Sequence, residues 1–556
     1  MNQTVNESAP RAYKHAVFLV LFTCLVYAQS IGFPFLHFDD TIYIVENNYV
    51  HQWASVPSFF TGAADGGPAE NGPKIVANLY RPLPQVWVLL NYKLWGVQPA
   101  LWHLTSVGFY VLAVCLLWRL TWKLTRDPFV AIAAALLYAM HPTHVEGVAW
   151  VSGATVETLL AVCFFGGFLA YLRWREDGRI VWLMACGVLN LLALFTKETG
   201  AALPVLIIAH AIIFRASDNT TGQAPTNRGR QLVSLLLTLG AAVAVYALLR
   251  LHALHTVMAS RPLHGWGDVF RTAPLAFVAY ILHFFRPVPL APWYDINIVT
   301  TPGLINFYLP LLVCIAYLAL TVWAILRKSL DGFLMLFWAL TLAVPLVGII
   351  AFPEFAIVQD RLSFVAIAGA AILVARVLAL LPRTGRVLFG FNASSVAALA
   401  VIIAALGVLS ALQVNTWKSD LAMCTNAIKV CPQSLRPRVL LGAEYMKLKD
   451  PVRAVAAYRD AANMAPNHWE VFYAYGIALA SAGDRPEAVR AMTHAMDVSP
   501  AMTPPYMVAA DLLARDGRID EALAVLERGI PVAREPGILR QERMQLLALK
   551  QRLAAH

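Results

Sequence analysis

The sequence predicts an all-α membrane protein, in which a polytopic helical bundle of about eleven spans precedes a short α-solenoid. Hydrophobic residues occupy 59% of the 556 positions and charged residues only 14%, a composition that excludes an ordinary soluble globular protein. The apolar residues gather in runs long enough to cross a bilayer. After about residue 415 the sequence becomes amphipathic and repetitive, which indicates a separate domain outside the bilayer.

A helix needs about 20 mostly apolar residues to cross a membrane. The runs that approach this length lie at about 15–35, 100–122, 128–142, 146–172, 180–196, 199–215, 231–252, 305–327, 332–351, 363–382 and 395–414. No small-residue cleavage site follows the first run, so we expect a retained helix and not a removed signal peptide.

Basic residues predict the sidedness of the bundle. Arg11 and Lys14 precede the first run, and Arg119, Lys123 and Arg126 follow the second. Later basic clusters recur after every second run, as the positive-inside rule requires for a cytoplasmic N-terminus. The net charge of +10 is thereby accounted for, and nucleic-acid binding is disfavoured. An odd number of spans then places the C-terminal region on the outer side.

One apolar segment, 272–286, is too short to cross comfortably, and a crossing would reverse the sides of the later basic clusters. We therefore expect it to be a re-entrant or interfacial helix. The predicted domains are a membrane domain, 1–415, with a long first outer loop at 36–98, and a connecting helix at 416–431. Within that loop, the Gly/Pro-rich stretch 62–73 is too poor in apolar residues to pack, so we expect it to be mobile.

The region 432–556 carries a repeat. Pro432, Pro466 and Pro500 are spaced by 34 residues, and small and large apolar residues recur between them in register. This pattern is typical of tetratricopeptide (TPR) repeats, in which paired helices stack into a solenoid with a concave face. We expect about three repeats and a final capping helix. Just before them, Cys424 and Cys431 can form a disulfide only if the chain bends between them.

Polar residues collect where the predicted spans reach the outer side. Asp39 and Asp40 follow the first span, and they mark either a solvated helix end or a functional site. Arg81 lies in the same outer loop. Lys197 and Glu198 interrupt a later apolar run, either as a charged turn or as part of a site.

Two further outer segments carry candidate ligands. His141, His144 and Glu146 are close enough in sequence to bind a metal, or to cap the turn between two helices, but their spacing matches no well-attested zinc pattern. Asp360 and Arg361 open the tenth span. Arg361 can neutralise Asp360 or hold a phosphate at the membrane surface.

Carboxylates and cations facing one compartment suit a reaction between a membrane-anchored phosphate compound and an external acceptor. A carboxylate would deprotonate an acceptor hydroxyl, and fixed cations would stabilise the departing phosphate. A single leaving phosphate needs no divalent ion in this scheme, so we expect no cofactor or metal, although a metal requirement stays open.

The order of several short motifs resembles one family. They are Phe38-Asp39-Asp40, Asn47-Asn48, Tyr80-Arg81-Pro82-Leu83, His141-Pro-Thr-His144-Val-Glu146, Thr196-Lys197-Glu198-Thr199-Gly200, Asp360-Arg361-Leu-Ser-Phe364 and Trp417-Lys418. Together they resemble the transmembrane-and-TPR protein O-mannosyltransferases and their bacterial relatives, in the GT-C glycosyltransferase superfamily. The resemblance covers nearly the whole chain, although Asp360-Arg361 and Phe364 stand where animal members more often have Glu-Arg and Tyr.

The resemblance implies an inverting transfer of a sugar from a polyprenyl-phosphate donor in the outer leaflet to Ser or Thr of a protein. Asp39 would be the base and Asp40 its partner. The expected residues for the donor phosphate and sugar are Arg361, Arg81, Lys197, Glu146, His141, His144 and Asp360. The TPR groove would bind the protein acceptor, with Tyr445, Tyr475 and Tyr506 as candidate contacts.

Two alternatives stay open. The same fold would serve transfer to a lipid or a surface glycan, or the chain is a non-enzymatic scaffold or transporter with a TPR docking module. Charges at one surface and the lack of two-fold internal symmetry disfavour transport. The resemblance also predicts a bacterial inner membrane with a periplasmic active site, or the endoplasmic reticulum lumen in a eukaryote.

Overall fold

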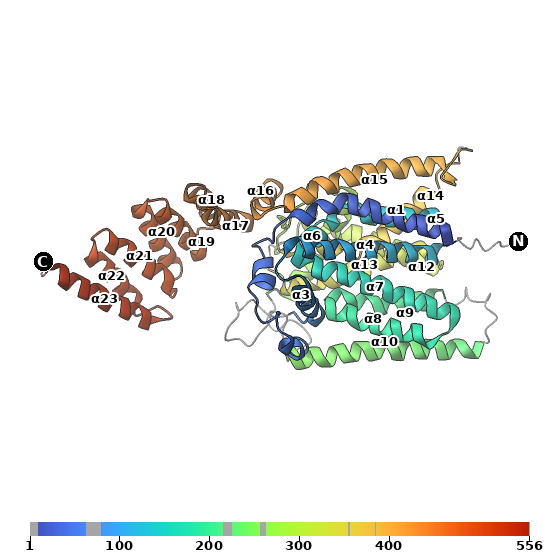
Figure 1. Cartoon of the computed structure of the whole chain (residues 1–556), viewed down its shortest axis with the longest axis horizontal. Helices are drawn as coiled ribbons and strands as arrows, with labels where there is room; N and C mark the ends of the chain where they lie inside the picture. Colours follow the sequence, from blue (N-terminus) through green and yellow to red (C-terminus); the bar gives the residue numbers. More distant parts are fainter. Residues whose placement is uncertain are drawn as a thin grey trace. The chain divides into compact units, whose positions relative to one another are not determined.

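The computed structural model describes residues 9–62, 79–214, 225–255, 263–353, 356–383 and 385–554. The described chain is helical apart from loops and one antiparallel hairpin, formed by β1 (Val387–Leu388) and β2 (Phe391–Asn392). It divides into two compact units, residues 1–419 and 420–556, which are coloured from blue to orange and from orange to red in Figure 1. The predicted all-α class is confirmed.

The helices of the first unit follow the predicted apolar runs closely. The long ones are α1 (Ala9–Tyr27), α4 (Pro99–Thr125), α7 (Val151–Asp177), α10 (Pro225–Leu254), α11 (Trp266–Phe285), α12 (Leu309–Leu326), α13 (Leu330–Gly348) and α15 (Ala393–Val414). Shorter ones are α2 (Val56–Thr61), α3 (Pro82–Trp95), α5 (Pro128–Ala139), α6 (Glu146–Ala149), α8 (Ile180–Thr196), α9 (Ala202–Ile213) and α14 (Ile367–Ala379).

Within the described residues, eight helices are long and apolar enough to cross a membrane, or nine if a bent pair counts as one span. The bent pair joins Pro128–Ala139 to Pro142–Ala149 at 53°, and three other apolar helices, Ile180–Thr196, Glu198–Ile213 and Ile367–Ala379, are shorter. The chain is an integral membrane protein. Every one of the eleven predicted runs is largely helical, but not every one is of full spanning length.

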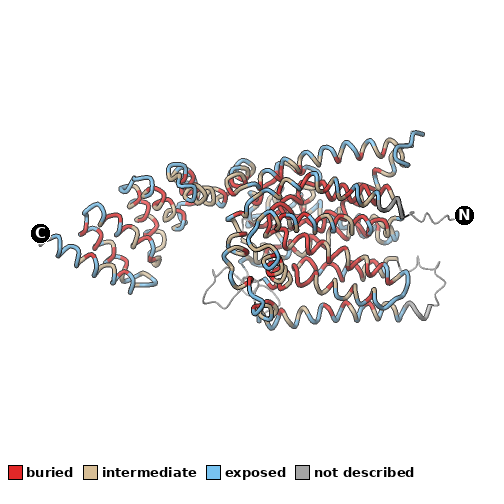
Figure 2. The backbone as a smooth tube through the Cα atoms, viewed as in Figure 1, coloured by how far each residue is buried: buried red, intermediate tan, exposed pale blue. Residues whose placement is uncertain are grey.

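Helix α7 forms the centre of the first unit. Of its most apolar stretch, 78% is buried, compared with 17% for α10 and α12, and Figure 2 shows the contrast between the buried interior and the exposed faces of the outer helices. At Gly167 an added Cβ would lie 3.0 Å from the Leu203 side chain. Small residues of this kind let the neighbouring helices approach closely.

Helix α11 covers the segment that we expected to be interfacial. With 20 residues it is long enough to cross, which the prediction underestimated. However, the backbone N–H of Leu263, just before it, donates to Ile350 at 2.8 Å, and His283 near its other end contacts Asp360 at 3.0 Å. Ile350 and Asp360 belong to one connection, between α13 and α14. Both ends of α11 thus contact this connection, and the interfacial placement stays a prediction.

The predicted outer segments meet at one end of the first unit. Asp40 contacts Ser152, and Arg81 contacts Glu198. The first outer loop adds a small apolar core that includes Phe59. The predicted mobile stretch 62–73 lies outside the described residues, except for Gly62.

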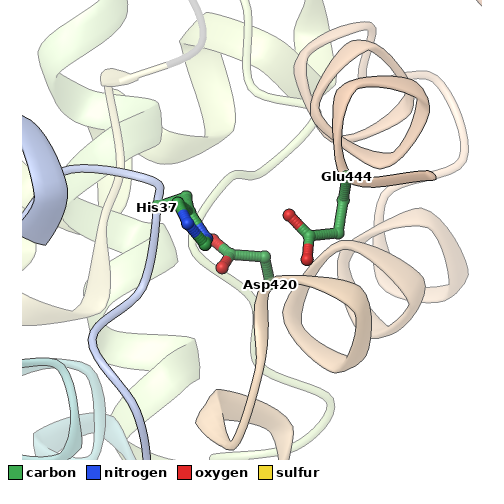
Figure 3. A group of neighbouring side chains, drawn as sticks. All are labelled: His37, Asp420 and Glu444. Carbon is green, nitrogen blue, oxygen red and sulfur yellow. The ribbon is translucent and has the colours of Figure 1, made fainter. Parts of the chain in front are cut away.

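The second unit consists of paired helices. They are α16 (Asp420–Val430), α17 (Arg436–Lys447), α18 (Pro451–Met464), α19 (Trp469–Ser481), α20 (Arg485–Val498), α21 (Thr503–Arg515), α22 (Ile519–Gly529) and α23 (Pro536–Ala554). Figure 3 draws Asp420 at the start of α16 and Glu444 on α17. Consecutive helices pack against one another, in agreement with our TPR interpretation. Cys424 and Cys431 are both buried and are not joined by a disulfide.

Two of the three tyrosines predicted for the acceptor groove are core residues instead. Tyr506 is fully buried and Tyr475 is 8% exposed. An added Cβ on Gly529 would lie 2.7 Å from the Tyr506 ring, so this ring fills the space between paired helices. The prediction was wrong for Tyr475 and Tyr506, because recurrence in a repeat also marks the residues that pack it. Tyr445 is half-buried and stays a candidate.

Candidate active site

A cavity of about 310 Å³ opens among the segments of the first unit that were predicted to lie on the outer side. Its polar lining comes from separate parts of the chain, and the rest is apolar, with side chains such as Val88, Phe352 and Leu362. The charged lining residues are Asp39, Arg81, Glu157, Lys197 and Arg361. Four of these five were predicted from the sequence, and Glu157 was not.

Asp39 and Asp40 separate at the start of the loop. Asp39 is half-buried and lines the cavity. Asp40 is only 1% exposed, and its carboxylate accepts hydrogen bonds from the backbone N–H groups of Leu36 at 3.0 Å and Ser152 at 2.9 Å, and from the Ser152 hydroxyl. Asp40 therefore anchors the loop to the start of α7. Asp40 was predicted to be the catalytic partner of Asp39, but it does not line the cavity, because adjacent residues of a helical turn point in different directions.

Arg361 is held from behind by Glu146. Its Nη1 donates to Glu146 Oε1 at 2.7 Å, and its backbone N–H donates to Oε2 at 3.1 Å. The guanidinium also lies over the Trp150 ring, 4.8 Å from the centroid. Glu146 is buried and does not line the cavity. Glu146 was predicted to lie in the donor pocket. The structure instead places it behind Arg361, which it holds in position.

Lys197 pairs with Glu157 of α7. The Lys197 Nζ lies 2.5 Å from Glu157 Oε1, and the two side chains are 6% and 3% exposed. Burial lowers the pKa of Lys197, and the neighbouring Glu157 offsets part of this effect. Both residues line the cavity. An ammonium group has three N–H donors, so Lys197 can serve Glu157 and a ligand at once.

Arg81 forms the third pair, with Glu198. Its Nη2 donates to Glu198 Oε2 at 2.6 Å and its Nε at 3.1 Å, while Arg250 Nη1 lies 3.8 Å from the other carboxylate oxygen. Burial alone would raise the pKa of Glu198, but the adjacent Arg81 lowers it below its ordinary value. Glu198 therefore remains ionised and fixes Arg81 at the cavity.

Three predicted donor-site residues do not reach the cavity. His141 Nδ1 contacts the Thr143 hydroxyl at 2.7 Å and its Nε2 contacts the Phe284 carbonyl at 3.0 Å. His144 Nε2 contacts the Phe364 carbonyl at 3.1 Å. Asp360 accepts from the Tyr294 hydroxyl at 2.7 Å and contacts His283.

These residues tie the outer segments together. The predictions for His141, His144 and Asp360 as ligand contacts were wrong. The two histidines and Glu146 engage different protein partners.

Sequence reasoning missed Glu157, Trp150 and Gln85, which also line the cavity. Glu157 had a usable signal, since an acidic residue inside an apolar helix is a functional candidate by default. Trp150 had none, because aromatic residues are common near a membrane surface, and a single Gln such as Gln85 carries no signal of its own.

The arrangement can bind a phosphate beside a carboxylate. Arg81, Lys197 and Arg361 each keep one carboxylate partner and further N–H donors, and Arg is well suited to phosphate because its planar group donates in pairs. Asp39 lines the same cavity. A carboxylate placed in this way can accept a proton from a bound hydroxyl.

Known proteins with similar sequences are protein O-mannosyl-transferases. TMTC3 of Homo sapiens is 29% identical over 211 residues, which cover 36% of this chain and 23% of that protein. Tmtc2 of Drosophila melanogaster is 30% identical over 235 residues, which cover 40% and 24%. The chain spans about a quarter of the length of these curated relatives. No protein-family model matches it.

Solved structures give more distant likenesses. The oligosaccharyltransferase of Archaeoglobus fulgidus has a TM-score of 0.39 at 15% identity, with 73% of this chain and 56% of that chain covered. ArnT from Cupriavidus metallidurans, bound to undecaprenyl phosphate, has a TM-score of 0.38 at 13% identity, with 86% and 79% covered.

The sequence matches therefore confirm the family resemblance that the motifs predicted: this chain is similar to the TMTC protein O-mannosyl-transferases.

Proposed function

We propose that the first unit transfers a sugar from a polyprenyl-phosphate donor to Ser or Thr hydroxyls of a protein. One observation carries this proposal: a single cavity gathers Asp39 with the three cations Arg81, Lys197 and Arg361. A base and fixed positive charges are the two groups that such a transfer needs. The apolar part of the lining suits the first units of a lipid chain.

The reaction follows from these roles. The acceptor hydroxyl attacks the anomeric carbon while Asp39 takes the hydroxyl proton. A new bond forms between this carbon and the acceptor oxygen, and the bond to the phosphate oxygen breaks on the opposite face, so the configuration inverts. Arg361, assisted by Arg81 and Lys197, stabilises the departing polyprenyl phosphate. No metal is required for any of these steps.

Mannose is the first candidate for the sugar, because the relatives carry O-mannosyl-transferase in their names. The second unit, interpreted as a TPR solenoid, would hold the acceptor protein. The cavity would then face the periplasm of a bacterial inner membrane, or the endoplasmic reticulum lumen in a eukaryote.

The test is the mass of outer-compartment proteins from cells with the wild-type enzyme, with Asp39→Asn and with no enzyme. We expect a hexose increment on Ser/Thr peptides with the wild type alone. If a lipid or surface glycan changes instead, the acceptor is wrong and the reaction class stands. If Asp39→Asn complements the deletion fully, the catalytic proposal fails, and a scaffold or transporter becomes the better account.

A further inference from the structure

Among the residues that the structure describes, an amide side chain that lines the cavity has no hydrogen-bond partner. Gln85 lines the cavity and is 6% exposed, and within the described parts of the chain neither its Nε2 nor its Oε1 has a hydrogen-bond partner. Nearly all buried polar groups in proteins are hydrogen-bonded, so an exception needs an explanation. An amide left without a partner destabilises the folded state.

The backbone around Gln85 explains why this amide belongs to the cavity. Gln85 is in the first turn of α3, which follows Arg81 and begins at Pro82. Arg81, Pro84, Gln85 and Val88 all line the cavity. Positions three, four and seven residues apart share one face of a helix, so this face of α3 forms one wall, with the Arg81 cation at its end.

The chemistry of the amide identifies what it would bind. A phosphate offers only acceptors, and the cavity already has three cations for it. A carboxamide combines two N–H donors with a carbonyl acceptor, so it can both donate to and accept from a hydroxyl group. Sugars present several hydroxyls that each do both.

We propose that Gln85 binds a hydroxyl of the donor sugar and contributes to sugar selection. This inference rests on the proposed function, because it takes the cavity to be the donor site. Arg361, Arg81 and Lys197 then bind the phosphate of the donor, and Gln85 recognises its sugar. Hydrogen bonds of this kind discriminate strongly, since a ligand without the matching group leaves the buried amide unpaired.

The test uses the purified full chain and two lipids, polyprenyl phosphate with and without mannose. We expect the wild type to bind the mannosylated lipid more tightly. Gln85→Met should weaken binding of that lipid by about tenfold, leave binding of the bare lipid unchanged, and leave the melting temperature equal or higher. Replacing an unpaired polar group with an apolar one of similar size is neutral or stabilising.

Asn190 supplies the matched control. It is a fully buried amide on α8 that does not line the cavity, and neither of its side-chain polar atoms has a partner among the residues described. Asn190→Leu should therefore leave the binding of both lipids unchanged.

Three results would overturn the inference. In the first, Gln85→Met retains the full preference for the mannosylated lipid. In the second, it weakens both lipids equally while lowering the melting temperature, which is the signature of a structural role. In the third, the wild type binds neither lipid, and then the proposed donor site fails together with the role of Gln85.

Discussion

The Arg361 guanidinium lies between the Glu146 carboxylate, 2.7 Å from its Nη1, and the face of the Trp150 ring, 4.8 Å away. The carboxylate fixes one edge of the planar group and the aromatic ring fixes its face. An Arg restrained in this way loses less conformational entropy on binding an anion than one that extends freely. Glu146 thus acts on a ligand through Arg361.

We expect Glu146→Gln to weaken binding of polyprenyl phosphate several-fold. The amide cannot hold both the guanidinium and the Arg361 backbone N–H as a carboxylate does. Arg361→Gln should weaken binding further. If Glu146 acts only through Arg361, the double variant binds no worse than Arg361→Gln alone, which lipid titration of the purified chain measures. Additive losses would contradict this role.

Asp39 and Asp40 should respond differently to the same change. Asp39→Asn is expected to lower the transfer rate by about 10²–10⁴-fold, the usual range for loss of a general base, with little change in melting temperature. Asp40→Asn should lower the melting temperature, because the carboxylate that accepts from Leu36 and Ser152 is lost. Rate and thermal unfolding are measured on both variants.

The control for this pair is Asp331→Asn, which removes a partly exposed partner of Arg376. Exposed ion pairs contribute about 0–1 kcal/mol, so neither the rate nor the melting temperature should change appreciably. A large rate loss with Asp40→Asn at unchanged stability would restore Asp40 to a catalytic role.

These two aspartates also illustrate what the sequence can and cannot predict. Apolar length and the 34-residue period predicted the helices, because bilayer thickness and helix stacking determine those patterns. Composition likewise identified which loops carry charge. The partners of each charge depend on tertiary packing. Asp40 was therefore predicted as a catalytic residue, and His141 and Asp360 as ligand contacts, although each one fastens protein segments together.

Glu157, in contrast, was not predicted as a site residue at all. It lies within an apolar helix, and the prediction concentrated on loops at the outer surface. Its partner Lys197 is 40 residues away in sequence, and nothing in a single sequence links the two. A contact between residues so far apart in sequence is seen only in the folded structure.

Breaking the Lys197–Glu157 pair should destabilise the first unit. A buried charge left without its partner costs about 3–5 kcal/mol, so Glu157→Gln and Lys197→Met should each lower the melting temperature. The double variant should recover much of the stability, because no buried charge remains, while donor binding stays weak because one cation is lost. Recovery of donor binding as well would show that Lys197 is structural only.

Acid should weaken the Arg81–Glu198 pair. The pKa of Glu198 is lower in the folded protein than its ordinary value of 4.5. The pair therefore contributes stability above about pH 4.5, and this contribution is lost as the pH falls through the lowered folded pKa. Comparison of the melting temperatures of wild type and Glu198→Gln from pH 7 to pH 3 should show a wild-type advantage that disappears at the acid end. A constant difference would contradict this assignment.

The last prediction distinguishes the functions proposed for the two units. At Gly442, an added Cβ would lie 2.7 Å from the Tyr458 ring, so Gly442→Val should force α17 and α18 apart and disturb the second unit. If that unit holds the acceptor, protein glycosylation falls while the first unit still binds polyprenyl phosphate. Gly537→Ala is the control, because a Cβ there meets no atom within 4 Å.

The mass of acceptor peptides and lipid titration report on the two functions separately. Loss of protein glycosylation with unchanged lipid binding is the expected result. Unchanged glycosylation in a Gly442→Val protein whose second unit has become sensitive to protease would mean that the acceptor is recognised at the cavity itself. Acceptor choice would then depend on the segments around Asp39, and the paired helices would serve another purpose.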